Sequence, residues 1–218
     1  MKLKPLNTLL FIVALGVFVY AFFIFDTHKP IRHLPFYGER ELKSTDTVYH
    51  TIPAFSFIDQ DGKTVTEKDF KDVIYVTDFF FTTCRSICPI MSTQMEKVAQ
   101  KFKDNDKVKI LSHTVDPETD SVPQLKNYAT QHHADSKQWI FVTGDKKALY
   151  DIARNGYLLD AHQGDGGPND FIHTQNFALI DKDKRIRGYY DGTNTKEVNQ
   201  LIKDIDLLLA EYEYKEKK

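Results

Sequence analysis

Alternating apolar and polar positions divide the chain after residue 50 into short strands and amphipathic helices. Residues 54–66, AFSFIDQDGKTVT, alternate on both sides of Asp61-Gly62, which predicts a β-hairpin. The β-branched and aromatic run VIYVTDFFF, residues 73–81, predicts a largely buried central strand. Apolar residues then recur at intervals of four, three and four positions, which predicts one face of a helix: Met91, Met95, Val98 and Phe102.

The rest of the chain alternates predicted strands with predicted helices. Strands are expected in residues 108–116, 139–144, 176–181 and 185–192, and helices in residues 122–132 and 146–157. The last two strands flank Lys182-Asp183-Lys184 as an antiparallel hairpin, and a final helix carries one apolar stripe: Val198, Leu201, Ile202, Ile205, Leu208 and Leu209. This order predicts an α/β sandwich in which helices cover a mixed sheet, a thioredoxin-like fold with an additional N-terminal β-hairpin.

An uncharged apolar run precedes these elements. Residues 6–25, LNTLLFIVALGVFVYAFFIF, are long enough as a helix to cross one bilayer core. The alternative is a cleaved signal peptide, but no small-x-small cleavage pattern follows the run. We therefore predict a single-pass transmembrane anchor in residues 1–25, a polar tether in 26–50, the folded domain in 51–212 and a charged tail in 213–218. Lys2 and Lys4 favour a cytoplasmic N-terminus, with the domain on the outer side.

Composition limits what the domain can do. The chain has 218 residues, enough after the leader for one compact domain, and 13% of them are aromatic, which excludes wholesale disorder. A net charge of −2 gives no electrostatic reason to expect a nucleic acid partner. Only two cysteines are present, too few for a disulfide-dense scaffold. These two cysteines are therefore the candidates for chemistry.

Both cysteines lie where the predicted central strand gives way to a helix, in DFFFTTCRSICPIM, residues 78–91. Pro89 suits the first helical position and keeps Cys88 close to an N-cap, where the helix dipole favours the Cys88 thiolate. Cys84 on the preceding loop is near enough in sequence for a disulfide or a shared metal ion. Burial as small apolar residues and a passive structural disulfide are the alternatives to functional thiolates.

Two thiolates suit Cu(I), whereas Cu(II) or Zn(II) also favours imidazole. His162 and His173 flank a glycine-rich loop and are candidate third ligands; His113 is expected to be structural, and His132 and His133 solvated. Two acidic residues, Asp78 and Asp116, are candidates either for orienting the site loops or for turn and cap positions. The helical spacing of Met91 and Met95 favours core packing over copper binding.

Four stretches of the chain resemble the SCO (SenC) copper proteins: FFFTTCRSICPIMSTQM, SHTVDPETDSVPQLKNYA, WIFVTGD and FIHTQNFALIDKDKRIRGYYDGT. The resemblance covers roughly residues 50–210. It implies a thioredoxin-like domain behind one membrane anchor, which in a bacterium means the inner membrane with the domain in the periplasm. It also implies copper, Cu(I) or Cu(II), held by Cys84, Cys88 and His173, with His162 as a bystander.

The implied function is that of a metallochaperone for the copper-site subunit of cytochrome c oxidase. One residue departs from the pattern, because many members have proline where this chain has Arg85. A cation there stabilises thiolates but repels incoming copper, which favours disulfide exchange over metal delivery. The alternative function is therefore a thiol–disulfide oxidoreductase that reduces the oxidase cysteines without carrying metal; a copper or redox sensor is a third possibility.

Overall fold

The computed structural model describes residues 13–20, 33–43, 46–159, 167 and 172–216. The chain divides into two compact units, residues 1–32 and residues 33–218. In the first unit, residues 13–20 are helical and exposed, and the rest of the predicted anchor lies outside the described residues. Among the described helices, none combines the length and apolar character needed to span a bilayer.

The second unit is built on a seven-stranded mixed sheet with the strand order β4-β3-β7-β6-β5-β8-β9. Its strands are β3 (Ser56–Asp59), β4 (Thr64–Thr66), β5 (Ile74–Phe80), β6 (Val108–Thr114), β7 (Trp139–Thr143), β8 (Asn176–Ile180) and β9 (Ile186–Asp191). The three central strands β5, β6 and β7 are parallel, and the hairpins β3–β4 and β8–β9 are added antiparallel at the two sides. A separate two-stranded ribbon joins β1 (Arg40–Lys43) to β2 (Asp46–Tyr49).

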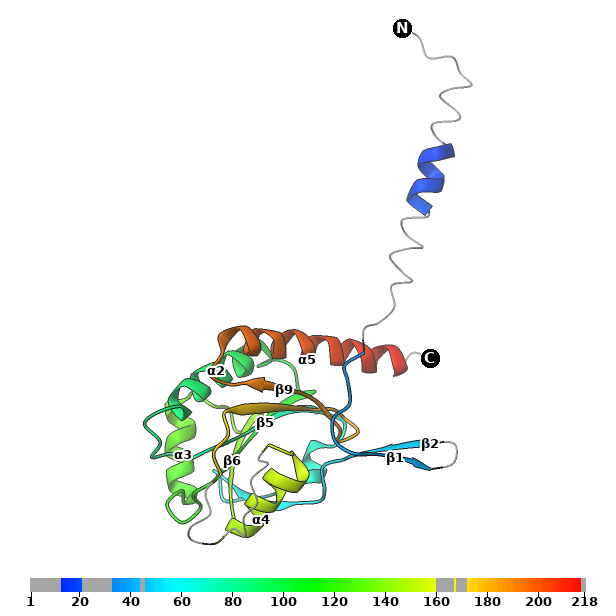
Figure 1. Ribbon diagram of the computed structural model, residues 1–218. Coiled ribbons are helices and arrows are strands. Elements are labelled where there is room, and N and C mark those ends of the chain that lie inside the picture. Colours follow the sequence, from blue (N-terminus) through cyan, green and yellow to red (C-terminus); the bar gives the residue numbers. More distant parts are fainter. Residues whose placement is uncertain (1–12, 21–32, 44–45, 160–166, 168–171, 217–218) are drawn as a thin grey trace. The chain divides into compact units, whose positions relative to one another are not determined.

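Helices cover both faces of the sheet, with α2 and α5 on one side and α4 on the other (Figure 1). They are η1 (Glu67–Phe70), α2 (Cys88–Lys101), α3 (Val122–Gln131), α4 (Lys146–Asp151), η2 (Ile152–Gly156) and α5 (Thr195–Glu216). Strand β5 is buried along its whole length because its side chains alternate between two cores. Val76 and Phe80 join α2, α3 and α5, whereas Tyr75 and Phe79 join the core beneath α4 and η2.

The predicted element order is confirmed, including the additional hairpin and the apolar helix face, in which Met91 and Met95 are fully buried. The helix expected in residues 146–157 differs at its end. It turns into the π-helical segment η2, which closes with the i→i+5 hydrogen bond from Tyr157 N to Ile152 O at 2.7 Å.

The segment expected as a tether is in contact with the domain from residue 33 onward. Arg187 on β9 is buried and donates hydrogen bonds to the carbonyls of Leu34 (2.9 Å) and Pro35 (3.1 Å). Its guanidinium also pairs with Asp181 and Glu211, at 3.0 Å each. One arginine therefore joins the incoming chain, the β8–β9 hairpin and α5.

Candidate functional site

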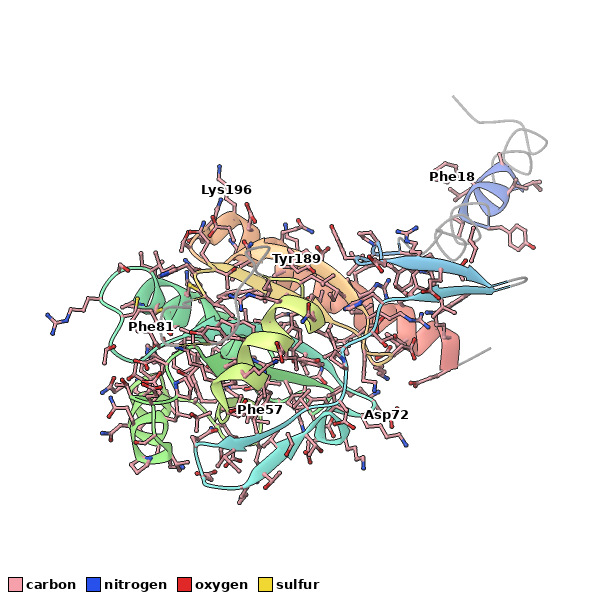
Figure 2. All side chains as sticks on the ribbon, turned by 60° about the horizontal axis from the view of Figure 1, so that its bottom comes forward. Phe18, Phe57, Asp72, Phe81, Tyr189 and Lys196 are labelled. Atoms are coloured by element: carbon pink, nitrogen blue, oxygen red, sulfur yellow. The ribbon has the colours of Figure 1, made fainter. Side chains whose placement is uncertain are left out.

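The candidate site lies at the carboxyl end of β5, where the buried strand leads into a tight turn. Figure 2 shows Asp72 and Phe81, which flank this strand, at opposite ends of the sheet. The turn Phe81–Cys84 is closed by a hydrogen bond from Cys84 N to Phe81 O at 3.2 Å. Cys84 is therefore presented on a short turn anchored in the centre of the sheet, and its side chain is half-buried.

Cys88 is the first residue of α2, with Ile87 at the N-cap and Pro89 inside the first turn. Proline is tolerated there because the N–H groups of the first turn have no helical acceptor. Cys88 is next to the N-cap, as the sequence predicts. Its side chain lies under the helix, in the core with Met91 and Phe80.

The pKa values of the two thiols are shifted in opposite directions. Partial burial of Cys84 opposes its ionisation, but hydrogen bonds from Ser86 and Cys88 outweigh this and lower its pKa to about 7. Burial raises the pKa of Cys88 to about 12, and its hydrogen bond to Cys84 acts in the same direction. The expectation that the position of Cys88 favours its thiolate is therefore wrong, because burial disfavours a charged sulfur there. Cys84 is the thiolate, and Cys88 is the thiol that donates to it.

Both cysteines are free in this structure, and their thiols are hydrogen-bonded to each other. His173 is exposed and lies three residues before β8. No three His, Cys, Asp or Glu side chains in the described part of the chain form a group able to hold a metal ion, so His173 is not gathered with the two cysteines. His162 lies outside the described residues.

His113 and His133 lie where the sequence indicated, whereas His132, which was expected to be solvated, is largely buried because it pairs with Glu96 and packs on Tyr128. His113 is fully buried, with its Nδ1 at 3.1 Å from Thr77 Oγ1, and burial lowers its pKa to about 3. His132 lies 2.6 Å from Glu96 and packs on Tyr128, and His133 is exposed. None of these side chains is near enough to both cysteines to complete a metal site among the described residues.

Asp78 and Asp116 have different surroundings. Asp78 is buried on the α2 side of β5, accepts a hydrogen bond from Ser112, and has its pKa raised to about 7 by burial. Asp116 belongs to a turn, where its carbonyl accepts from the backbone N–H groups of Thr119 and Asp120. Asp120, which no sequence pattern singled out, is fully buried and hydrogen-bonded to Thr82 in the cysteine turn. Only its place after the Val-Asp-Pro turn and before a helix start hinted at a role.

These observations define a class of protein: a thioredoxin-like domain that presents a thiolate and a neighbouring buried thiol at the end of its central strand. Residues 43–210 match the family model SCO1/SenC. The chain belongs to the SCO1/SenC family.

Individual relatives agree with this assignment. The chain is 30% identical over 170 residues to the SCO1 protein homolog of Bacillus subtilis, covering 77% of this chain and 86% of that one. It resembles the solved structure of BsSco, a member of the Sco family of cytochrome c oxidase assembly proteins in which a disulfide switch was identified, with a TM-score of 0.62, 29% identity and coverage of 73% and 93%. It also resembles ScoI of Bradyrhizobium japonicum with copper bound, with a TM-score of 0.58, 25% identity and coverage of 72% and 99%.

Proposed function

We propose that this chain is a copper-binding assembly protein for cytochrome c oxidase, in which Cys84 and Cys88 bind copper as thiolates. The observation that carries the proposal is the pair of adjacent thiols at the end of β5, one already ionised near neutral pH. The fold is shared with a relative solved with copper bound. Thiolate is the protein ligand that Cu(I) prefers, so the pair suits this metal as cargo.

Copper binding by this pair releases protons in a defined number. Near pH 8 Cys84 is a thiolate and Cys88 a thiol. One Cu(I) ion then forms two copper–sulfur bonds and displaces about one proton, which comes from Cys88. Below pH 6 Cys84 is protonated as well, and the count approaches two. A pH-stat titration with Cu(I) measures this directly.

His173 is the proposed third ligand. An imidazole added to two thiolates allows the same site to hold Cu(II) as well as Cu(I). His173 is exposed and lies three residues before β8, which runs antiparallel to β5, so it enters the sheet at the end where the cysteines lie. Copper binding would require this histidine to join the cysteine pair.

The test is copper stoichiometry and absorption on the reduced full chain in neutral detergent. We expect one copper per chain with thiolate-to-Cu(II) charge-transfer bands. These bands should be lost in His173→Asn and retained in His133→Asn, a control at another exposed histidine. The double variant Cys84→Ser/Cys88→Ser should bind no copper stoichiometrically; tight binding by that variant would contradict the proposal.

The split acidity of the thiols favours a second candidate, a thiol–disulfide oxidoreductase. The Cys84 thiolate would attack a partner disulfide and form a mixed disulfide. Cys88 would then attack Cys84 sulfur and release the partner, so two electrons and two protons pass to the partner as Cys84 and Cys88 become a disulfide. This reaction needs both cysteines but not His173. Unchanged exchange rates in His173→Asn, in a chain that retains no copper, would favour this candidate.

The proposed setting is the bacterial inner membrane, with residues 6–25 as the anchor and the domain in the periplasm. The proposed partner is the copper-site subunit of the oxidase. The length and uncharged composition of residues 6–25 support the anchor. Protease digestion of spheroplasts should remove the domain, whereas intact cells should protect it; protection in spheroplasts would contradict this orientation.

A further inference from the structure

A buried carboxylate holds the loop that carries Cys84. Asp120 is fully buried, in the loop between β6 and α3, and its carboxylate accepts a hydrogen bond from Thr82 N at 3.2 Å. The hydroxyls of Thr82 and Thr114 donate to the same carboxylate. Gln124 on α3 in turn donates to Thr82 Oγ1 at 3.3 Å. A fully buried carboxylate with three donors is a satisfied group that holds its donors tightly.

The residue that Asp120 holds belongs to the cysteine turn. Thr82 is the second residue of the turn Phe81–Cys84, which the bond from Cys84 N to Phe81 O closes. The same turn reaches the second cysteine, because the backbone N–H of Phe81 donates to the Cys88 thiol. A displacement of Thr82 would therefore move the turn relative to both sulfur atoms.

The position of Asp120 before α3 does not account for its contacts. The N-cap of α3 is Ser121, and no side-chain hydrogen bond caps this helix in the described structure. The carboxylate of Asp120 is turned instead toward Thr82 and Thr114. Its partners lie at the ends of β5 and β6, next to the turn that carries Cys84.

We propose that Asp120 is a positioning residue that keeps Cys84 and Cys88 together by fixing Thr82. The inference rests on the proposed function, since it concerns the same pair of thiols. A loop fixed in this way raises the effective concentration of one sulfur at the other. High effective concentration favours every state that needs both sulfurs, namely the intramolecular disulfide and the two-thiolate copper complex.

The test is the redox equilibrium of the metal-free full chain with glutathione, in which the dithiol and oxidised glutathione give the protein disulfide and two reduced glutathione molecules. We expect Asp120→Asn and Thr82→Val to lower the equilibrium constant for disulfide formation about tenfold, a shift of about 30 mV toward less negative potentials. Thr82→Ser keeps the hydroxyl and should retain the original constant.

The matched control is Asp204→Asn. Asp204 is also buried and accepts a hydroxyl hydrogen bond, from Tyr190 at 2.9 Å, but it lies on α5. The Asp204→Asn variant should be less stable than the wild type but should have the same equilibrium constant with glutathione. Equal constants for the wild type and Thr82→Val, or an equal shift in Asp204→Asn, would overturn the proposal. Because copper is absent from the assay, a failure of the copper proposal leaves this result unaffected.

Discussion

The asymmetry of the two thiols follows from where each side chain lies, although the two residues are only four positions apart. Cys88 is in the core under α2, where a charged sulfur is unfavourable. Cys84 is on the turn, where Ser86 Oγ lies 3.5 Å from its sulfur. Cys84 is therefore the more accessible and the more readily ionised of the two sulfurs.

This asymmetry predicts the pH dependence of alkylation. Only Cys84 should react quickly with iodoacetamide, with half-maximal rate near pH 7, because the thiolate is the nucleophile. Ser86→Ala removes a hydrogen bond to the thiolate and should move the midpoint to higher pH, whereas Ser121→Ala, a serine outside the site, should not. Peptide mass spectrometry over a pH series measures both cysteines; faster labelling of Cys88 would contradict the assignment.

Asp78 should make stability depend on pH. Its pKa in the folded chain, about 7, is well above the usual value of 3.8, so the folded state binds the proton more tightly. The contribution of this tighter proton binding to the free energy of unfolding is complete below about pH 4 and is lost as the pH rises to 7. Asp78→Asn keeps an acceptor for Ser112 and cannot ionise, so it should gain at least about 1 kcal/mol over the wild type between pH 4 and pH 8. Urea unfolding of both proteins at pH 4 and pH 8 measures this gain. The same change in stability with pH in the wild type and in Asp78→Asn would contradict the prediction.

At this scale the sequence indicated the chemical groups but not their environments. The spacing of Cys84 and Cys88 and the proline after them identify the pair without a structure. Burial of Cys88 and the contact of Asp120 with Thr82 depend on how α2 and the β6–α3 loop pack. Neither property leaves a local pattern in the residues concerned.

Secondary structure elements with strong periodicity were predictable, and elements without it were not. The apolar face of α2 and the alternation in β3–β4 encode their elements directly. The ribbon β1–β2, with sequences RELK and DTVY, has little apolar alternation. It lies in residues 26–50, for which the sequence predicts only a polar tether. The π-helical end of α4 adds one residue to a turn, a change that does not disturb apolar spacing enough to be recognised.

The contacts between elements at Arg187 carry a prediction for stability. Arg187→Leu would leave Asp181 without its buried cation and remove the donors to Leu34 and Pro35. Loss of one partner of a buried ion pair costs about 3–5 kcal/mol, so we expect a loss of that order in the free energy of unfolding. Arg185→Leu is the control, since its pair with Asp183 is partly exposed, at 3.6 Å, and should cost about 1 kcal/mol or less. Urea denaturation of both variants is the measurement, and equal losses would contradict the role of Arg187.

Across the second unit, the sheet separates two cores and places the cysteines at one end of it. The core with α2, α3 and α5 includes Cys88, whereas the core beneath α4 and η2 holds His113 and its aromatic neighbours, among them Phe79 at 4.8 Å between ring centres. The thioredoxin-like architecture was predictable because the alternation of strands and helices encodes it. The position of His173 relative to the cysteines was not, because His173 precedes β8 and is far from them in sequence.

The short segment before the ribbon has a consequence for solubility. Strand β9 is the last strand of the sheet, and the backbone of residues 34–37 lies beside it, with Tyr37 N donating to Ile186 O at 3.0 Å. Unpaired strand edges recruit other chains, so this segment shields the domain from self-association. A chain starting at residue 38 should therefore form dimers or larger species at concentrations where one starting at residue 33 stays monomeric. Light scattering of the two would reveal the difference, and equal masses would mean that the edge of β9 is protected in another way.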